Sequence, residues 1–332
     1  MPRLPRYLPE AAAQFEAVAS RVRRAAKISV VAHIKPDADA IGSACALAAG
    51  LRKLGTDAQV YIGQPLPHSS NMRTIPGADE ILYGQPLPAD GLVVTVDCAS
   101  ADRTGSHMPA ILSDPSRVVV IDHHNTNPGF GGTNLIVESE STTVMVRELL
   151  GYLGAELDPD IAYGLYAGLV TDTGSFRWGT PRMHDLAAEL MQFGLDTRQI
   201  AMDLMDTMGP VDLQLMGAVL SKTQIVPTKG FSLAVLTIPV GIHSRMSQTA
   251  VEVITDYARS LEGTDVGVVL KEQAPRFWAM SLRSTVVDVS AVAQRLGGGG
   301  HRAAAGYSAA GSRDAIIREL IDAFPEHPSA HD

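Results

Sequence analysis

The chain has 332 residues with 45% hydrophobic and 19% charged content, the composition of an ordinary globular protein, and its length favours two domains over one. Its net charge of -9 argues against a large basic surface for long duplex nucleic acid, although a local basic patch can hold a short phosphate chain. The opening MPRLPRYLPE lacks an apolar signal-peptide core, and no apolar run approaches the ~20 residues of a membrane helix. We therefore expect a soluble, cytoplasmic protein, with Cys45 and Cys98 as core thiols in a reducing compartment.

The first half of the chain alternates strands and helices in the pattern of a parallel sheet. A polar, amphipathic helix is predicted at 10–27, followed by an apolar strand at 27–33 and an Ala-rich helix at 39–54 that ends at Gly55. Further strands are predicted at 57–62, 91–97 and 117–122, and helices at 141–153, 158–170, 181–193 and 197–206. These helices are expected to flank the sheet.

The pattern restarts after one connecting helix at 211–223. Strands are predicted at 231–239, 266–273 and 277–284, helices at 248–261 and 289–296, and a strand-like segment follows a glycine run near the end. We predict an α/β protein with a parallel-sheet N-terminal domain at 1–195, a helical linker at 196–224 and a smaller C-terminal α/β domain at 225–332. The active site is expected in the cleft between the two domains.

Acidic and histidine side chains gather at the carboxyl ends of three predicted strands, and one more acid follows an apolar helix. Because the carboxyl ends of parallel strands meet at one edge of a sheet, where open α/β folds keep their active sites, these side chains are expected to lie together. Carboxylate oxygen and imidazole nitrogen both suit a divalent ion such as Mn²⁺, and this many ligands favours two metals that share a bridging carboxylate. The residues are His33, Asp37, Asp39, Asp97, Asp122, His123, His124 and Asp172.

Each of these residues also has an ordinary structural interpretation when it is taken alone. Asp37 and Asp39 are suited to cap the helix that follows them, and Asp97 to cap a later helix. His33 alone fits a hydrogen-bonded residue at a strand end, and Asp172 alone fits a turn. The combination favours a metal centre, because independent structural roles do not predict acids and imidazoles at the ends of several strands of one sheet.

These residues resemble the four motifs of the DHH phosphoesterase superfamily in order and spacing: HIKPDAD at 33–39, Asp97, the DHH triplet at 122–124, and Asp172. The stretch GGGGHRAAAG at 297–306 resembles the signature of the DHH-associated domain, which occurs in RecJ exonucleases and in the nanoRNase/pAp phosphatase (NrnA-like) family. The resemblance covers nearly the whole chain. The combination of motifs is specific, whereas a glycine run alone would be weak.

The resemblance implies a ligand set for two divalent ions, with Mn²⁺ favoured and Mg²⁺ or Co²⁺ as alternatives. Asp97 would bridge the two ions. Asp122 would orient an imidazole, and His124 would face the substrate phosphate, so the catalytic set is His124, Asp97 and Asp122. One ion would be held by His33, Asp37 and Asp97, and the other by Asp39, Asp97, His123 and Asp172.

The glycine run is predicted to bind a substrate phosphate. Residues without a Cβ let backbone N–H groups approach a phosphate closely, and His301 adds a donor beside Gly298, Gly299 and Gly300. Arg283 and Ser284 end a predicted strand, and the resemblance places the corresponding pair at the same phosphate. The alternative is a flexible linker, but a strand-like segment follows the glycines at once.

The resemblance also narrows the substrate. The C-terminal signature disfavours pyrophosphate, and the chain has no spare length for the nucleic-acid module of RecJ. The remaining compact type trims RNA of a few nucleotides, removes the 3′-phosphate of 3′-phosphoadenosine 5′-phosphate (pAp), and in some cases hydrolyses cyclic di-AMP or its linear product pApA. Long duplexes and membranes are not expected partners, and a homodimer through the apolar helices at 158–170 and 211–223 competes with their burial in a monomer core. A non-catalytic nucleotide sensor is the alternative function.

Overall fold

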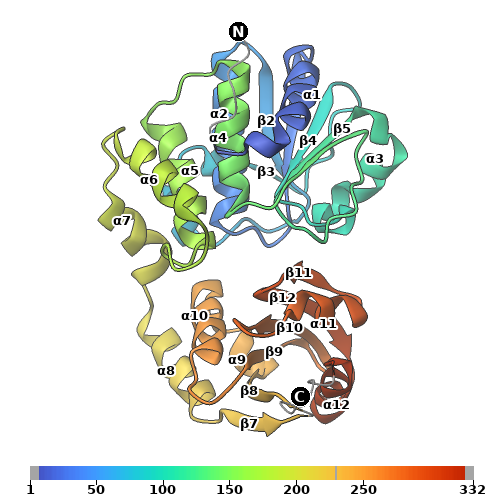
Figure 1. The fold of residues 1–332 in the computed structure, drawn as a ribbon, viewed down its shortest axis with the longest axis vertical. Coiled ribbons are helices and arrows are strands. Elements are labelled where there is room, and N and C mark those ends of the chain that lie inside the picture. Colours follow the sequence, from blue (N-terminus) through green and yellow to red (C-terminus); the bar gives the residue numbers. More distant parts are fainter. Residues whose placement is uncertain (1–6, 229, 326–332) are drawn as a thin grey trace, which may run out of the picture. The chain divides into compact units, whose positions relative to one another are not determined.

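The computed structural model describes residues 7–228 and 230–325, which divide between Thr207 and Met208 into two compact units (Figure 1). The predicted fold class is confirmed, because the N-terminal unit contains a parallel sheet and the C-terminal unit a mixed sheet, both covered by helices. The narrower division into 1–195, 196–224 and 225–332 stays a prediction.

The N-terminal sheet has six parallel strands in the order β3-β2-β1-β4-β5-β6. The chain builds outward from β1 in one direction through β2 and β3, and then restarts at β4 on the other side of β1. The carboxyl ends of β1 and β4 therefore form a topological switch point, which is where open α/β sheets leave a crevice for ligands. The strands are β1 (Lys27–Ala32), β2 (Asp57–Ile62), β3 (Leu82–Tyr83), β4 (Leu92–Val96), β5 (Val118–Asp122) and β6 (Thr133–Ile136).

Helices cover both faces of this sheet, and the side chains of its strands alternate between two cores. Val94 and Ile121 belong to the large core under α1, α2, α4 and α5, whereas Val93 and Val120 belong to a smaller core that includes Ile111 of α3. The helices are α1 (Ala12–Arg23), α2 (Ala38–Lys53), α3 (Met108–Ser113), α4 (Thr142–Leu153), α5 (Pro159–Asp172), α6 (Pro181–Met191) and α7 (Thr197–Ala201), the last continued by a π turn at Met202–Asp206. Short 3-10 turns lie at Pro9–Ala11, Ser70–Thr74, Ala78–Glu80, Ala101–His107 and Pro115–Arg117.

Helices α2 and α5 cross at glycines. A Cβ at Gly42 would lie 2.2 Å from the carbonyl oxygen of Gly164, a distance that no real side chain tolerates. The two backbones therefore pack together only because neither residue has a side chain at the crossing. This crossing matters for function, because α2 begins beside the switch point and α5 ends with Asp172.

The C-terminal sheet has the order β11-β12-β10-β9-β8-β7, in which β8 and β9 are parallel and the other neighbours are antiparallel. One core packs α8 and α10 on the sheet, and a second core packs α11 and α12 on it. The strands are β7 (Gln224–Pro227), β8 (Ser232–Ile238), β9 (Val266–Ala274), β10 (Phe277–Arg283), β11 (Gly299–His301) and β12 (Ala304–Ala310). The helices are α8 (Pro210–Leu220), α9 (Val240–His243), α10 (Gln248–Arg259), α11 (Val289–Arg295) and α12 (Arg313–Ala323).

Two predictions made from composition can be compared with the structure. Cys45 and Cys98 are buried free thiols, as expected. Among the described residues, none of the helices combines the length and apolar character needed to cross a bilayer.

We predict that Gly42→Ala lowers the free energy of unfolding by about 1–3 kcal/mol, the usual cost of overpacking a core. The added methyl group must push α2 away from α5. Gly217 is the matched control, because it also lies inside a helix but a Cβ there would have nothing within 4 Å. Gly217→Ala should therefore leave stability unchanged or raise it slightly. Urea unfolding of both variants measures this, and equal effects would contradict the close crossing.

Candidate metal centre

The acids and imidazoles predicted from the strand ends converge at the switch point of the N-terminal sheet. His33 directly follows β1, Asp97 directly follows β4, and Asp122 is the last residue of β5. The structure assembles these groups into overlapping clusters of possible metal ligands, with the ligand atoms in each cluster within 4.8 Å of one another. Asp172 joins them from the last position of α5, a helix that we had predicted to end at residue 170.

The first cluster consists of His33, Asp37 and Asp97. His33 Nε2 lies 3.5 Å from Asp37 Oδ2 and 3.4 Å from Asp97 Oδ2. Asp37 Oδ1 accepts a hydrogen bond from the Ala40 N–H and so caps α2. The capping interpretation of Asp37 is confirmed, and it leaves the ligand interpretation open to the same residue, because one carboxylate oxygen caps the helix while the other faces the cluster.

The second cluster consists of Asp39, His123 and Asp172. His123 Nε2 lies 3.4 Å from Asp172 Oδ2 and 3.9 Å from Asp39 Oδ2. The same nitrogen is 3.4 Å from Asp97 Oδ1. Asp97 thus turns one carboxylate oxygen to each cluster, which is the placement that a bridging ligand requires.

The backbone and its neighbours hold Asp97 in this position. Asp97 has a left-handed backbone with φ of 58°, an uncommon conformation for a residue with a side chain. Its N–H still donates to the Ile121 carbonyl, so the strand continues to its last residue before the chain turns. The Thr142 hydroxyl donates to Asp97 Oδ1 over 3.0 Å. Backbone strain of this kind persists where surrounding contacts fix it, and it is concentrated at functional sites.

Asp39 is held by the N-terminal end of α4. The N–H groups of Thr142 and Thr143 donate to its two carboxylate oxygens over 2.7 and 3.0 Å. These N–H groups have no partner within their own helix, and the helix end carries partial positive charge. Gly168 of α5 makes the arrangement possible, because a Cβ there would lie 2.7 Å from Asp39 Oδ1.

Backbone carbonyls orient the two histidines of the clusters. His123 Nδ1 lies 3.1 Å from the Ser139 carbonyl oxygen, and His33 Nδ1 lies 2.9 Å from that of Ile34. With a proton on each Nδ1 that donates to these carbonyls, Nε2 is the nitrogen that faces the carboxylates, the arrangement typical of metal-binding histidines.

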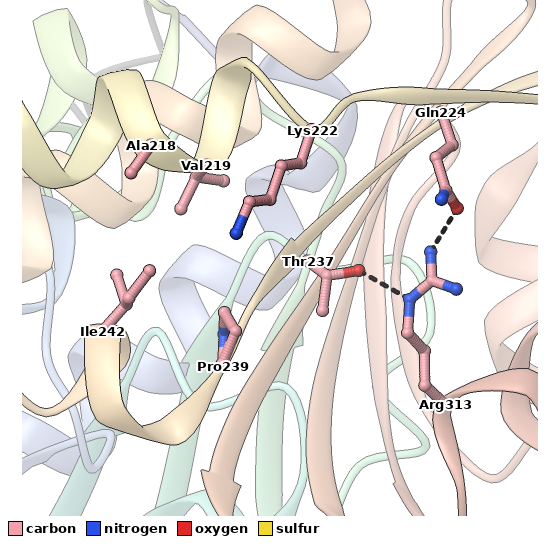
Figure 2. A pocket seen from close by; sticks show the side chains of 8 residues that line it. All are labelled: Ala218, Val219, Lys222, Gln224, Thr237, Pro239, Ile242 and Arg313. Carbon is pink, nitrogen blue, oxygen red and sulfur yellow. Dashed lines mark hydrogen bonds between the residues drawn. The ribbon is translucent and has the colours of Figure 1, made fainter.

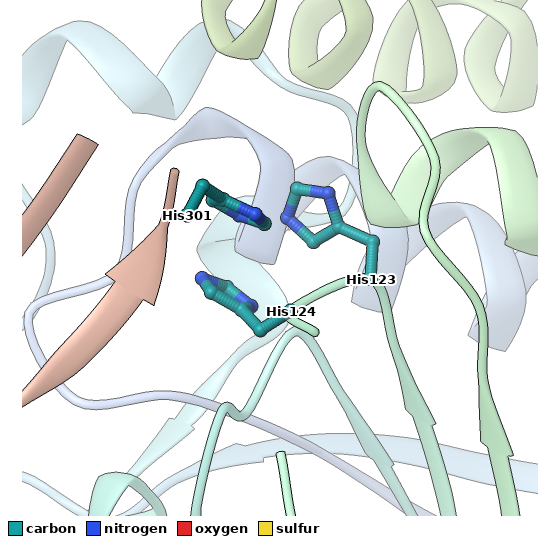
Figure 3. Close-up of side chains that lie close together, drawn as sticks. All are labelled: His123, His124 and His301. Atoms are coloured by element: carbon teal, nitrogen blue, oxygen red, sulfur yellow. The ribbon is translucent and has the colours of Figure 1, made fainter. Parts of the chain in front are cut away.

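Asp122 serves the other histidine of the triplet. Its Oδ1 lies 2.9 Å from His124 Nδ1, and its Oδ2 accepts from Asn127 Nδ2 over 2.7 Å. The rings of His123 and His124 meet edge to face with centroids 4.7 Å apart (Figure 3). Asp122 is thus positioned to orient His124, whereas His123 takes its orientation from the Ser139 carbonyl.

Charge crowding shifts the pKa values of the clustered groups. Burial, reinforced by the negative charge of Asp97, raises the pKa of Asp39 to about 7. Burial together with the charges of Asp39 and Asp37 raises the pKa of Asp172 well above its ordinary value, although its side chain remains 27% exposed. Burial opposes the charged form of His33, but attraction and hydrogen bonding to Asp37, with a further hydrogen bond to Asp97, raise its pKa to about 10.

The central carboxylate and its histidine partner shift in opposite directions. Burial alone would raise the pKa of Asp97, yet hydrogen bonds with His123 and His33 hold it well below its ordinary value. Burial would lower the pKa of His123, yet its hydrogen bond to Asp97 and the charge of Asp172 raise it. The carboxylates of the site favour bound positive charge, and in the absence of metal they obtain it by binding protons. Carboxylate oxygen and imidazole nitrogen together form a donor set that suits Mn²⁺-type cations. The residues therefore fit divalent metal ions.

Sequence reasoning missed the groups that support this centre. The hydroxyl-rich start of α4 was visible as SESTT, but nothing in the sequence connects Thr142 to Asp39, 103 residues away. Two cations beside His33 were also missed. Arg103 has a terminal nitrogen 3.1 Å from His33 Nδ1, and burial and the nearby Arg103 charge lower the pKa of Lys35. Neither cation has an acidic partner within the part of the chain that the structure describes.

The predicted phosphate-binding residues belong to the C-terminal unit. Gly299–His301 forms β11, the edge strand of its sheet, where we had predicted only a glycine run. A Cβ at Gly298 would lie 2.1 Å from the Gly306 carbonyl oxygen, so this glycine is required by strand packing itself. Outward N–H groups of an edge strand have no ladder partner and remain available to an anion.

Arg283 is the last residue of β10 in the C-terminal unit and Ser284 follows it. Their side chains differ in how far they are available to contact a substrate. The Arg283 side chain is half-buried, and one of its terminal nitrogens donates to the Leu282 carbonyl. The Ser284 hydroxyl donates to the Asp265 carbonyl and accepts the N–H groups of Val286 and Val287. These three bonds shape the following turn, so substrate contact by Ser284 stays a prediction.

The fold and site define a DHH-type phosphoesterase, and comparisons with known proteins support this assignment. Residues 27–169 match the DHH family, N-terminal domain, and residues 230–326 match the DHHA1 domain. The chain belongs to the DHH family and is a metal-dependent phosphoesterase of that family.

Several relatives resemble the chain over most of its length. It is 33% identical over 310 residues to the bifunctional oligoribonuclease and PAP phosphatase NrnA of Thermus thermophilus, covering 90% of this chain and 89% of that protein. The NrnA of Bacillus subtilis is 25% identical over 307 residues, covering 89% and 94%. A solved structure of an exopolyphosphatase-related protein from Bacteroides fragilis superposes with a TM-score of 0.79 at 22% identity, covering 94% and 95%. RecJ of Thermus thermophilus, solved in complex with Mn²⁺, shares the fold with a TM-score of 0.50 at 16% identity, covering 98% of this chain and 56% of RecJ.

We predict that stability in the presence of chelator falls as the pH rises from about 4 to about 10. Asp39 has a folded pKa of about 7 against 3.8 for its ordinary value, and His33 about 10 against 6.5. In each case the folded state binds more protons than the unfolded state between the two values, so deprotonation favours unfolding. The stabilisation that protonated Asp39 gives the folded state is lost as the pH rises from 3.8 to about 7, and that from His33 is lost between pH 6.5 and about 10.

Urea unfolding at pH 6, 7.5 and 9 measures this dependence, with excess Mn²⁺ as the paired condition. Metal cations take the place of the protons, so the decline should become shallower when metal is present. A chelated protein that is equally stable at all three pH values would contradict the electrostatic description of the site.

Proposed function

We propose that this protein uses two divalent metal ions, Mn²⁺ being favoured, to hydrolyse short 5′-phosphorylated oligoribonucleotides to 5′-mononucleotides and pAp to AMP. The observation that carries the proposal is Asp97, whose two carboxylate oxygens lie against two different ligand clusters. In this assignment His33, Asp37 and Asp97 hold one ion, while Asp39, Asp97, His123 and Asp172 hold the other. When bound, a pair of ions of this kind supplies an activated water and stabilises the charge that develops on the phosphoryl oxygens.

The proposed role of His124 is to contact the substrate phosphate. Asp122 accepts the hydrogen bond from His124 Nδ1, and this fixes the ring so that Nε2 points away from Asp122. The His124 side chain is 21% exposed, compared with 4% for His123. Partial exposure suits a group that must meet a ligand, and burial suits a group that only faces the metal clusters.

Lys35 and Arg103 are proposed to bind phosphoryl oxygens on the His33 side of the centre. Arg103 contacts His33 of the first cluster, the Lys35 ammonium is close enough to Arg103 for its pKa to be lowered by that charge, and neither makes an ion pair with the described acids. Lys35 also has a left-handed backbone with φ of 54°, and its N–H is fixed by the Gln64 side chain. Cations in such a position stabilise the charge that accumulates on a phosphoryl group during transfer.

The substrate class follows from the relatives and from the C-terminal unit. Proteins named as oligoribonuclease and PAP phosphatase match this chain nearly end to end. A 5′-phosphate bound by Arg283, His301 and the N–H groups of Gly298–Gly300 would leave the phosphorus on the 3′ oxygen as the reacting atom. Release of that 3′ oxygen yields a 5′-mononucleotide from pApA and AMP from pAp, so one chemistry covers both substrates.

Cyclic di-AMP is a second candidate substrate. A cyclic-di-AMP phosphodiesterase of Listeria monocytogenes is 26% identical over 205 residues, covering 58% of this chain and 29% of that protein. Cyclic di-AMP has no terminal phosphate for the proposed phosphate-binding residues to hold. We therefore place it below pApA and pAp.

The proposal predicts that protein supplied with Mn²⁺ releases AMP from pApA and from pAp. It should act more slowly on cyclic di-AMP and leave pyrophosphate and an RNA of about 24 nucleotides intact, because a compact protein offers little surface for a longer chain. Product chromatography measures each rate. Asp172→Ala and added chelator should each abolish AMP release.

The same experiment separates an enzyme from a nucleotide sensor. If pApA and pAp bind, as followed by calorimetry, but neither is cleaved with any of Mn²⁺, Mg²⁺ or Co²⁺, the catalytic proposal fails and the sensor replaces it. Faster cleavage of cyclic di-AMP than of pApA would reverse the substrate order.

Arg103→Gln and Lys35→Gln are each predicted to lower kcat/KM for pApA by roughly ten- to a hundredfold, the value of a charge-assisted hydrogen bond. Lys35→Gln should leave Mn²⁺ affinity unchanged, because Lys35 touches no proposed ligand. The matched control is Lys27→Gln at the other end of β1, where Lys27 pairs with Asp90 at the surface. Steady-state kinetics and Mn²⁺ titration measure these effects, and a Lys35 variant with the kinetics of the Lys27 control would disprove the role.

A further inference from the structure

The C-terminal unit contains a cavity of about 210 Å³ that the proposed reaction does not use (Figure 2). It lies between the end of α8, the start of β7, the end of β8, α9 and the start of α12. This volume lies below the usual range of sites for drug-sized ligands, which favours a small molecule.

The cavity is separate from the glycine run. The strand registers connect Gly299 to Gly306, then to Ser281, Val269 and Leu236, the neighbour of the cavity residue Thr237. This row crosses from β11 to β8 in four strand spacings of about 4.8 Å, or roughly 19 Å. A ligand of this size cannot occupy both places.

One wall of the cavity is cationic and already ordered. Arg313 Nε donates to Thr237 Oγ1 over 2.9 Å, and a terminal nitrogen donates to Gln224 Oε1 over 2.6 Å. Both partners are neutral, so they fix the guanidinium without cancelling its charge. Among the described residues, the acid that pairs with Arg313 is Asp314, whose side chain is 81% exposed, and an ion pair with so exposed a partner is weak.

Lys222 brings a second cation to the same space. Its side chain extends from the end of α8 toward Thr237, Pro239 and Ile242 (Figure 2). The Lys222 side chain is exposed, and its ammonium makes no ion pair or hydrogen bond with the described residues. The partial negative charge at the end of α8 favours a cation there, but it does not explain why Arg313 is held on the same cavity.

The remaining wall is apolar. Val219 is buried at 1% exposure, and Pro239 and Ile242 line the cavity beside it. The cavity thus has two cations, a hydroxyl and an amide on one side and aliphatic carbon on the other. This lining matches a small molecule with an anionic head and a short uncharged body. Arginine suits phosphate in particular, because its planar fork donates two parallel hydrogen bonds.

We propose that this cavity is a second anion site, which binds a small phosphate monoester with the phosphate between Lys222 and Arg313. The phosphate supplies the negative charge that these cations lack, and its carbon body lies on Val219, Pro239 and Ile242. The site is independent of the proposed hydrolysis, because every residue in it belongs to the C-terminal unit and lies away from the glycine run.

Calorimetric titration of the full chain with glycerol 3-phosphate tests the proposal. The protein is kept in chelator, so that metals do not create a phosphate site in the N-terminal unit, and ionic strength is matched with NaCl. Wild-type protein should bind glycerol 3-phosphate at a saturable site besides the proposed glycine-run site, bind inorganic phosphate more weakly there, and bind neither glycerol nor lactate there. Lack of saturation at about 10 mM, or tighter binding of lactate, would overturn the phosphate assignment.

Two variants place the binding in the cavity. Lys222→Glu should weaken glycerol 3-phosphate about tenfold or more, the value of a lost charge-assisted contact. Ala218→Phe, which fills the cavity without a change of charge, should do the same. Arg318→Glu is the matched control, since Arg318 is exposed on α12 outside the cavity and the substitution makes the same reversal of charge as Lys222→Glu.

The affinities of the three variants for glycerol 3-phosphate show whether the anion binds in the cavity. Arg318→Glu should keep the wild-type affinity, and thermal melting should show that all three variants remain folded. If Lys222→Glu and Arg318→Glu weaken binding equally, the effect is one of overall charge and the site is disproved. If Ala218→Phe is folded and still binds as wild type, the anion binds elsewhere and the proposal fails as well.

Discussion

The crowding of buried carboxylates around Asp97 is the constraint on which the rest of the site depends. Like charges this close repel strongly in a medium of low dielectric, so the fold must either supply positive charge or neutralise some of the acids. It does both: imidazoles face Asp97 on two sides, and the N–H groups of α4 hold Asp39. Asp172 adds to the cost, because it stands at the carboxyl end of α5, where a helix disfavours negative charge. Such an expensive arrangement is explained by cations that the site is built to hold.

Rigid neighbouring elements hold these acids in place against their mutual repulsion. Strand β4 is buried along its whole length, so its end is a fixed mount for Asp97. The glycine crossing of α2 with α5 brings the start of one helix and the end of the other to the same place, which is how Asp39 and Asp172 reach one histidine. The order of strands then locates the centre, because a sheet built outward in both directions from β1 and β4 leaves its crevice at their carboxyl ends.

The sequence predicted the parts that depend on local pattern. Apolar runs predicted β1, β2, β4 and β5 to within a residue or two, and polar groups at their ends identified the cluster. The edge strands β3 and β6 were missed, because one has two residues and the other is only partly buried, so neither carries an apolar signal. Contacts such as that of Thr142 with Asp39 could not be predicted, since they depend on how the start of one helix meets the start of another over a hundred residues away.

Lys35 and Asp97, two of the non-glycine residues with a left-handed backbone, show where predictions from local sequence fail for a functional reason. Nothing in the letters of Lys35 or Asp97 indicates a positive φ, and propensity alone would place both in extended backbone. The chain adopts the costlier conformation because the surrounding bonds, from Gln64 to the Lys35 N–H and from Thr142 to the Asp97 carboxylate, determine it more strongly than local preference does. Strained backbone persists at such a site because it orients a side chain that the function requires. Positions where prediction from sequence fails therefore help to locate the functional residues.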